Sequence, residues 1–448
     1  MSSELETGDN SDVYSVGMSK LRVAVVGAGA AGLCAARHIL ARPALYDPPV
    51  VYELTENVGG TWCYEERVGC YGNGHPIPSS MYKNLRTNLP KEVMMFPDFP
   101  FDEQLPSFLP HQEVQRYLER YSQSHQVTPH IQFSTVVDEV KPITLETEGA
   151  GPKTVWEVKS SDKEGSQKME RFDSVFVCSG HYSDPCLPDI PGMEHFKGTV
   201  MHSHSYRVPE PYSGQSVVVL GAGASGLDIS MELAGANAQV ILSHGKPPFT
   251  FPLPPGLRQA PPLTRVNEDG TFSFQDGSGT RAQVLLLCTG YNYTFPYLRG
   301  PALGLEVRRE LVSPLYRFLL PPAFPSLFII GVCKLILPFP HFHCQVQFAL
   351  RVLEGAAPLP PGPQMEEEVR EHMEAQRSLG VPSKHLLRLQ KEQWGYCQDL
   401  ARDGEFAPIP AVTRSLYEEV WRCRNVHPQD YRKANYRLAS DTQWVLKD

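Results

Sequence analysis

The strongest constraint on this chain is a glycine pattern that occurs twice. Residues 23–33 read VAVVGAGAAGL, and residues 217–230 read VVVLGAGASGLDIS. In both, a valine-rich run that favours a buried strand leads into Gly-x-Gly-x-x-Gly and then into a helix-forming segment. In that context the first glycine permits a tight turn, the second lets a pyrophosphate approach the backbone, and the third lets the helix pack on the strand. The chain is therefore predicted to hold two dinucleotide sites rather than two ordinary strand–helix turns.

The residue that ends the second strand of each unit distinguishes the two sites. The first unit has VVYEL at 50–54, which places Glu53 where a carboxylate binds ribose hydroxyls and repels a 2′-phosphate, so this site favours FAD or NAD. The second unit has AQVILS at 238–243, followed by His244-Gly245-Lys246, with no carboxylate. Ser243 and Lys246 suit a 2′-phosphate and hence NADPH, although Lys246 could also be a solvated loop lysine.

Strands and helices are expected to alternate through the first unit. Turn residues and aromatics dominate residues 55–110, which we therefore expect to be irregular. The remaining predicted elements are a strand at 21–26, a helix from Ala30, a strand at 50–54, a helix at 113–124, a β-rich region at 130–177 and a buried strand at 174–180.

The second unit repeats this opening and is followed by further strands and helices. Its predicted elements are a helix at 224–235, a strand at 238–243, a Pro-rich stretch at 247–262, a hairpin with turns at Asp269-Gly270 and Asp276-Gly277, and a buried strand that ends at Gly290. Beyond 325 we expect a strand, a helix over 343–355, a Pro-rich break at 358–363 and charged helical segments. This alternation predicts an α/β fold with mainly parallel sheets and two Rossmann-like dinucleotide-binding domains, one inserted into the other.

Composition excludes several classes of function. The net charge is −9, with no long run of Lys or Arg, which disfavours nucleic-acid binding. None of the ten cysteines forms Cys-x-x-Cys or a zinc spacing, so neither a dithiol oxidoreductase nor a metal site is expected. The most apolar stretch, 326–339, contains Lys334 and is interpreted as core. We therefore expect a cytoplasmic protein without an integral membrane anchor.

The segment FKGTVMHSHSY at 196–206, between the two glycine patterns, fits F-x-G-x-x-x-H-x-x-x-Y through Phe196, Gly198, His202 and Tyr206. In this the chain resembles the flavin-containing monooxygenases, a branch of the class B flavoprotein monooxygenases, in their soluble short form. The related Baeyer–Villiger enzymes usually end the pattern with Trp, whereas this chain has Tyr206. His202 is interpreted as a structural residue.

Three more stretches carry the resemblance. NLRTNLPKEVMMFPDFPF at 84–101 is similar to the family's flavin-adjacent loop, and Asn88 matches its active-site asparagine. CTGYNYTFPYL at 288–298 is similar to its A-T-G-Y segment. LPFPHFHCQVQFA at 337–349 is similar to its second flavin-contacting segment, with His343 where the family usually has glutamate and Gln345 retained.

The resemblance implies NADPH-dependent chemistry on FAD. Reduced flavin would trap O₂ as a C4a-hydroperoxide, which oxygenates a soft nucleophile such as an amine nitrogen or a thioether sulfur. The partners would be that small molecule and O₂, and a homodimer is possible. The alternatives are a Baeyer–Villiger monooxygenase and a two-dinucleotide NADPH oxidase or reductase.

The resemblance also implies domain limits and site residues. The domains would be a disordered lead at 1–19, the FAD domain at 20–190 and 326–448, the latter with a C-terminal helical region, and an inserted NADPH domain at 191–325. Asn88 is the catalytic candidate, and Asp228 could instead cap its helix. The FAD candidates are Gly27, Ala28, Gly29, Ala30, Ala31, Gly32, Glu53, Gly60, Thr61, Trp62, Thr87, Asn88, Leu89 and Gln345, and the NADPH candidates are Gly221, Gly223, Ser225, Gly226, Leu227, Asp228, Ser243 and Lys246.

Overall fold

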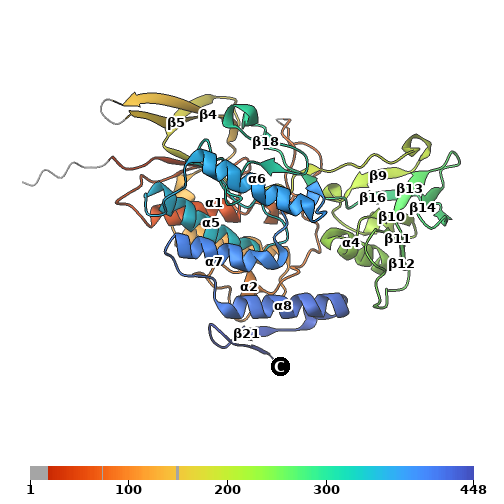
Figure 1. The fold of residues 1–448 in the computed structure, drawn as a ribbon. Coiled ribbons are helices and arrows are strands. Elements are labelled where there is room, and N and C mark those ends of the chain that lie inside the picture. The colour runs from red at the N-terminus through yellow and green to blue at the C-terminus, as the bar shows by residue number, and fades with distance from the viewer. Residues whose placement is uncertain (1–18, 73, 148–150, 448) are drawn as a thin grey trace, which may run out of the picture.

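The computed structural model describes residues 19–72, 74–147 and 151–447. Two α/β units lie side by side, a larger one built from both ends of the chain and a smaller one, green in Figure 1, built from its middle. The expected lead at 1–19 lies outside the described residues except for Ser19. The predicted α/β class with two parallel-sheet cores is confirmed, whereas the exact domain limits stay a prediction.

The larger unit is organised around a parallel sheet with the strand order β20-β7-β1-β2-β3. Central strand β1 is flanked by β2 and β7, and its four residues are all buried, which explains its run of valine and alanine. Because β20 pairs with β7, the chain leaves this sheet after β7 and returns to it after the middle unit. The strands are β1 (Val23–Val26), β2 (Val50–Tyr52), β3 (Ile131–Gln132), β7 (Ser174–Val177) and β20 (Leu327–Ile329).

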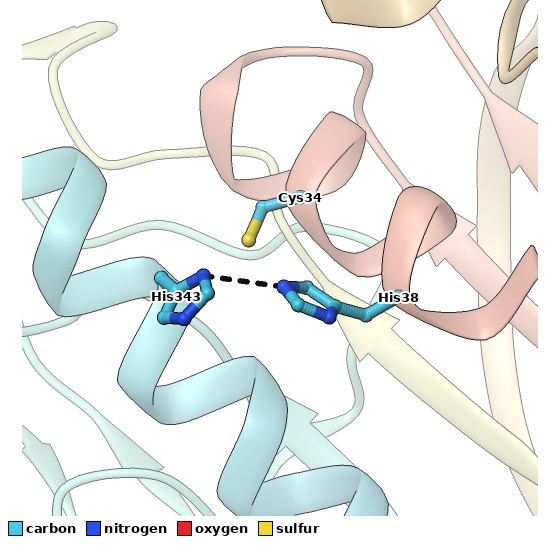
Figure 2. Close-up of side chains that lie close together, drawn as sticks. All are labelled: Cys34, His38 and His343. Carbon is cyan, nitrogen blue, oxygen red and sulfur yellow. Dashed lines mark hydrogen bonds between the residues drawn. The ribbon is translucent and has the colours of Figure 1, made fainter. Parts of the chain in front are cut away.

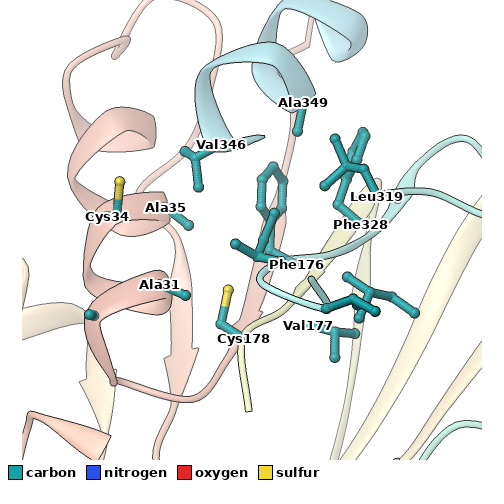
Figure 3. Close-up of a cluster of buried hydrophobic side chains, with 14 of the residues drawn as sticks. Ala31, Cys34, Ala35, Phe176, Val177, Cys178, Leu319, Phe328, Val346 and Ala349 are labelled. Carbon is teal, nitrogen blue, oxygen red and sulfur yellow. The ribbon is translucent and has the colours of Figure 1, made fainter. Parts of the chain in front are cut away.

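Two helices pack together over this sheet, α1 (Ala30–Leu40) and α5 (Pro338–Leu353). Ala31 and Ala35 of α1 face Phe176 of β7, and Val346 and Ala349 of α5 close the same cluster (Figure 3). Small side chains on α1 allow the helix to approach both the sheet and α5 closely. α5 starts five residues before the expected helix, because Pro338 fits the first turn, where no backbone donor is needed.

The smaller unit contains the second parallel sheet, in the order β12-β11-β10-β16-β9. The predicted strands and the helix α4 (Ala224–Gly235) are present, whereas β12 was missed because it lies inside the Pro-rich stretch. The strands are β9 (Thr199–His202), β10 (Ser216–Leu220), β11 (Gln239–Ser243), β12 (Leu257–Ala260) and β16 (Val284–Leu287).

The predicted hairpin is the centre of a three-stranded antiparallel sheet, β13 (Leu263–Val266), β14 (Phe272–Phe274) and β15 (Gly279–Thr280). Both predicted turns are present. Asp269 and Asp276 each accept a hydrogen bond from the backbone N–H two residues later, and the following glycines have φ values of 78° and 82°.

The other elements surround the two units. Residues 55–110 are irregular, as expected, apart from the short turns η1 (Gly60–Trp62) and α2 (Lys91–Met94). The two connections between the units pair as a short antiparallel ribbon, β8 (Asp184–Pro185) with β17 (Tyr291–Asn292). The remaining elements are α3 (His111–Ser124), α6 (Gly362–Ser378), α7 (Gln393–Asp403), α8 (Ala411–Val426), η9 (Tyr431–Lys433), β4 (Val136–Thr147), β5 (Gly151–Ser161), β6 (Gln167–Phe172), β18 (Glu306–Val307), β19 (Val312–Ser313), β21 (Tyr436–Leu438) and β22 (Trp444–Leu446).

Candidate dinucleotide sites

The first glycine turn joins β1 to α1 and depends on glycine at its first and third positions. Gly27 has φ +102°, and a Cβ there would lie 2.7 Å from the carbonyl oxygen of Cys178. A Cβ on Gly32 would lie 1.8 Å from the carbonyl oxygen of Gly27. Neither position can carry a side chain without moving the backbone, which agrees with the roles predicted for a tight turn and for close helix–strand packing.

A second loop covers this turn. Gly59 donates its backbone N–H to the carbonyl of Ala28 at 3.0 Å, and a Cβ on Gly60 would lie only 3.0 Å from the Cα of Gly29. These two facing glycines let the 59–62 loop lie against the first turn, and Trp62 packs edge-on against Phe339 of α5. The sequence placed Gly60 and Trp62 near a cofactor, and the structure places them beside the first glycine turn.

Glu53 ends β2 next to the same turn and is buried. One carboxylate oxygen accepts the N–H of Ala28 at 2.7 Å, and the other accepts the N–H and hydroxyl of Thr55 at 2.9 and 2.8 Å. Burial raises the pKa of Glu53, and these hydrogen bonds oppose the rise. The carboxylate is thus held beside the turn in the position predicted for a ribose ligand.

The second glycine turn has the same backbone but different surroundings. Gly221 has φ +104° and faces the carbonyl of Cys288 at 2.6 Å from its virtual Cβ, and the virtual Cβ of Gly226 lies 1.8 Å from the carbonyl oxygen of Gly221. No atom of the described residues lies within 4 Å of a Cβ placed on Gly223, and residues 223–225 are exposed. This turn is therefore open where the first is covered.

Both helices that follow the turns have free N-termini. Gly29 and Gly223 are the N-cap residues, and neither helix has a side-chain cap or an acidic residue in its first turn. Such a terminus binds phosphate through its free N–H groups and the positive end of the helix dipole. The alternative prediction that Asp228 caps α4 is wrong, because α4 begins at Ala224 and Asp228 lies beyond its first turn.

Asp228 instead joins the two units. One of its oxygens accepts the Tyr82 hydroxyl at 2.5 Å, and the other pairs with Arg432 at 2.6 Å. Arg432, from η9 near the C-terminus, also donates to the carbonyl of Thr87 at 3.0 Å. No local pattern pointed to Arg432, because its partners Asp228 and Thr87 are 204 and 345 residues away along the chain.

Lys246 reaches the second turn, where its Nζ donates to the carbonyl of Ala222 at 2.6 Å. Burial lowers its pKa, and repulsion from Arg424 and Arg388 lowers it further. Lys246 thus brings a positive charge to this turn, and the charges of Arg424 and Arg388 act on it. Ser243, in contrast, is fully buried, donates to the carbonyl of Pro261 and accepts from the N–H of Leu263, so its hydroxyl already has both partners.

Asn88 lies half-buried in the loop that runs between the units. Its side-chain amide makes no hydrogen bond within the described residues, so it is free to bind a ligand. Its neighbour Thr87 is buried, and its hydroxyl accepts the N–H of Leu109 at 2.9 Å, which fixes the loop. The structure thus separates a residue that holds the loop from one that is available for chemistry.

Gln345 also has a structural role, because its side chain links Gly331 to Tyr396. Its side-chain oxygen accepts the N–H of Gly331 at 2.8 Å, and its nitrogen donates to the hydroxyl of Tyr396 at 2.8 Å. Both ends of the amide are thus engaged within the protein. Among the other candidates, the buried ones are Ala28, Ala30, Ala31 and Leu89, the partly buried ones are Trp62 and Leu227, and the exposed ones are Thr61 and Ser225.

The segment 196–206 contains β9 and the residues on either side of it, which contact the rest of the smaller unit. A Cβ on Gly198 would lie 2.3 Å from the carbonyl of Gln283. His202 uses both ring nitrogens on the backbone, Nε2 with the Gly290 carbonyl at 3.0 Å and Nδ1 with the N–H of His204 at 3.1 Å. Tyr206 donates to Glu232 of α4 at 2.8 Å. These contacts fit the structural role predicted for His202. Burial lowers the pKa of its imidazole to about 4.

Two clusters that contain cysteine were not predicted, because their members come from segments that are distant in the sequence. α5 and α7 bring Cys344 beside Cys397, whose sulfur lies 3.8 Å from Nδ1 of His341. The Cys344 thiol and His341 lower the pKa of Cys397. Cys34, His38 and His343 form the second cluster. Neither has a Cys-x-x-Cys or zinc-finger spacing that could have revealed it.

Comparison with known proteins identifies the family. The family model described as flavin-binding monooxygenase-like matches residues 20–250 and 260–444. This chain belongs to that family. It is similar to the flavin-containing monooxygenase FMO GS-OX5 of Arabidopsis thaliana, with 34% identity over 95% of this chain and 92% of the relative.

Two solved structures also match most of the fold. The S-allyl-L-cysteine S-oxygenase of Allium sativum superposes with a TM-score of 0.84 at 33% identity, covering 93% of this chain and 96% of the other. Tmm of Pelagibacter sp. strain HTCC7211 superposes with a TM-score of 0.80 at 28% identity, covering 95% and 96%. The chain is thus a flavoprotein monooxygenase, an oxidoreductase, as the resemblance predicted. None of its described helices has the length and apolarity to cross a bilayer.

Proposed function

We propose that this flavin-containing monooxygenase binds FAD at the first glycine turn and NADPH at the second, and oxygenates soft nucleophiles at sulfur or nitrogen. The observation that carries the proposal is the contrast between the carboxylate of Glu53, which lies beside the first turn, and the ammonium group of Lys246, which lies beside the second. A carboxylate beside the first turn and a positive charge beside the second select different dinucleotides.

The residues at the first turn fit FAD. The free N–H groups at the start of α1 suit a phosphate, and the Glu53 carboxylate beside the turn suits ribose hydroxyls. The covering loop at 59–62 would then enclose the bound group from the other side.

The residues at the second turn fit NADPH. The free end of α4 can take the pyrophosphate, and Lys246 lies at the same turn with Arg388 and Arg424 close enough to lower its pKa. Neither arginine has an ion pair within the described residues, so both remain available to a 2′-phosphate. The exposure of this turn suits a cofactor that must enter and leave in each cycle.

When bound and reduced, the flavin supplies the activation of O₂. The chain's own contribution is to orient and to exclude water. The loop at 82–88 touches α4 through Tyr82 and carries the unpaired amide of Asn88. We assign Asn88 the role of hydrogen-bonding donor to the reacting groups between the units.

The names of the relatives favour sulfur as the first target to test. Purified enzyme with FAD and NADPH is supplied with ¹⁸O₂ and either a thioether or a tertiary amine, and the product is analysed by mass spectrometry. We expect one labelled oxygen in a sulfoxide or N-oxide for each NADPH consumed. NADPH oxidation that yields only hydrogen peroxide with both compounds would refute the proposal, and a lactone or ester formed from a ketone would favour the Baeyer–Villiger alternative.

A further inference from the structure

Three side chains with metal-binding atoms meet between α1 and α5, beyond the first glycine turn. Cys34 and His38 are four residues apart on one face of α1, and His343 lies in the second turn of α5. Their ligand atoms all lie within 4.8 Å of one another. Figure 2 shows the sulfur directed at the gap between the two imidazole rings. The glycine turns and the nicotinamide site use none of these three side chains.

The cluster is sealed from solvent. Cys34 is fully buried, and His38 and His343 are 3% and 7% exposed. Nε2 of His38 lies 3.2 Å from Nδ1 of His343, so one of the two nitrogens carries the shared proton. Burial lowers the pKa of both histidines, which keeps their imidazoles neutral and able to act as ligands.

We propose that Cys34, His38 and His343 form a binding site for Zn²⁺ that ties α1 to α5. A thiolate and two imidazoles are the ligand types that zinc prefers, whereas Mg²⁺ and Ca²⁺ require oxygen ligands. The site goes beyond the proposed oxygenation and does not depend on it.

The spacing is close to that of a zinc site. With Zn–S near 2.3 Å and Zn–N near 2.0 to 2.1 Å, tetrahedral ligand atoms lie about 3.3 to 3.6 Å apart. The two nitrogens, 3.2 Å apart, already meet this spacing. The sulfur, at most 4.8 Å from either nitrogen, needs a shift of about 1 Å, which a χ1 adjustment of Cys34 provides.

Binding is balanced in charge and protons. Zn²⁺ displaces the thiol proton of Cys34, which leaves the protein, and the resulting thiolate and the two neutral imidazoles donate electron pairs to the metal. The proton between the rings moves off Nε2 of His38 onto its Nδ1.

Two present contacts conflict with the zinc form. Nε2 of His343 lies 3.2 Å from the side-chain nitrogen of Gln347 and must carry a proton when Nδ1 binds zinc, so the Gln347 amide has to rotate. The second contact, at His38, gives the proposal a specific signature. Nδ1 of His38 now accepts from the guanidinium of Arg37 at 2.8 Å, but in the zinc form it must donate. Arg37 therefore has to turn away and keep only its ion pair with Asp98. A histidine ligand normally donates its second N–H to an acceptor, so replacing Arg37 with an acceptor should strengthen the site.

The test uses the flavin-loaded enzyme, stripped of metal by dialysis against a chelator. Zn²⁺ is titrated in competition with a chromophoric chelator, and the zinc-loaded protein is studied by X-ray absorption at the zinc edge. We expect one Zn²⁺ per chain with one sulfur and two imidazole neighbours, and a zinc-dependent rise in the unfolding temperature. No stoichiometric zinc, or a zinc site without sulfur, would overturn the proposal.

Matched variants locate the site. Cys34→Ala is expected to weaken zinc binding more than 100-fold, beyond the 10- to 100-fold typical of outer contacts, whereas Cys333→Ala, which also removes a buried thiol, leaves it unchanged. Arg37→Gln is expected to tighten binding about 10-fold, because its amide oxygen can accept from Nδ1 of His38. Equal zinc affinity in Cys34→Ala and wild type, with both folded by circular dichroism, would contradict the assignment. His38→Ala provides a second ligand deletion if Cys34→Ala proves unstable.

Discussion

The two glycine turns share one backbone and differ in what covers them. At both turns the first glycine faces a cysteine carbonyl and the third lies against the carbonyl of the first. The middle glycine differs, since Gly29 lies under Gly60, while nothing within the described residues approaches Gly223. The shared part makes a phosphate site possible, and the cover decides how long a ligand stays. Under the proposed function, the covered turn suits a retained flavin and the open turn suits a dinucleotide that exchanges.

Substitution of the two middle glycines gives the largest contrast. Both have φ near −75°, which any residue adopts, so neither change strains the backbone. Gly29→Val is expected to collide with Gly60, to destabilise the fold by about 1–3 kcal/mol and to abolish flavin retention. Gly223→Val is expected to keep stability and flavin, and to raise the KM for NADPH at least about 10-fold.

Flavin absorbance per chain and thermal unfolding read out the first effect, and steady-state NADPH oxidation reads out the second. Flavin loss in Gly223→Val, or full flavin retention in Gly29→Val, would remove the distinction between a retaining and an exchanging turn.

Replacement of Lys246 tests which phosphate the open turn recognises. Lys246→Ala removes a cation at Ala222, so the KM for NADPH is expected to rise about 10-fold and that for NADH to change little. Rapid-mixing measurements of flavin reduction by each cofactor give the two values. Lys197→Ala is the control, because Lys197 also donates to a backbone carbonyl, that of Glu194, but lies away from the turn. An equal effect on both cofactors would take Lys246 out of the 2′-phosphate site.

Arg432 tests whether the open turn depends on contact with the larger unit. Arg432→Met breaks the ion pair with Asp228 and the bond to the Thr87 carbonyl, leaving a carboxylate with only Tyr82. We expect flavin reduction by NADPH to slow several-fold, while flavin content stays normal. Lys433→Met, which removes an exposed cation one residue away, should behave as wild type. Wild-type reduction rates in Arg432→Met would show that the turn acts without this contact.

The smallest effect concerns acid stability. Burial lowers the pKa of His202 to about 4 from an unfolded value near 6.5, so the neutral ring stabilises the fold above pH 6.5, and this stabilisation is lost as pH falls from 6.5 towards 4. We expect chemical unfolding to show a loss of about 1 kcal/mol or more over this range. His202→Gln should lose less over the same range, and identical pH profiles would exclude His202 as a source of acid sensitivity.

Local patterns predicted the two βαβ openings well, because strand, turn and helix signals there lie within thirty residues of one another. Contacts between distant segments were beyond the sequence. Gln345 and Ser243 were predicted to be ligands, yet both side chains are already hydrogen-bonded within the protein, Ser243 to backbone groups and Gln345 to the Gly331 N–H and the Tyr396 hydroxyl. The strand β12 was hidden by flanking prolines, which tertiary pairing with β11 tolerates because they fall outside the ladder. Asn88 was predicted from resemblance alone, and its unpaired amide is consistent with that prediction.

The paired ribbon of β8 and β17 has a mechanical consequence. Both connections between the units run through it, and side chains reinforce it, since Thr289 donates to the Cys186 carbonyl and Asn292 donates to Asp184. A single connecting segment would allow the smaller unit to rotate about that segment. Two hydrogen-bonded strands oppose rotation about their long axis while still allowing bending, so we expect the smaller unit to move relative to the larger one as a hinge.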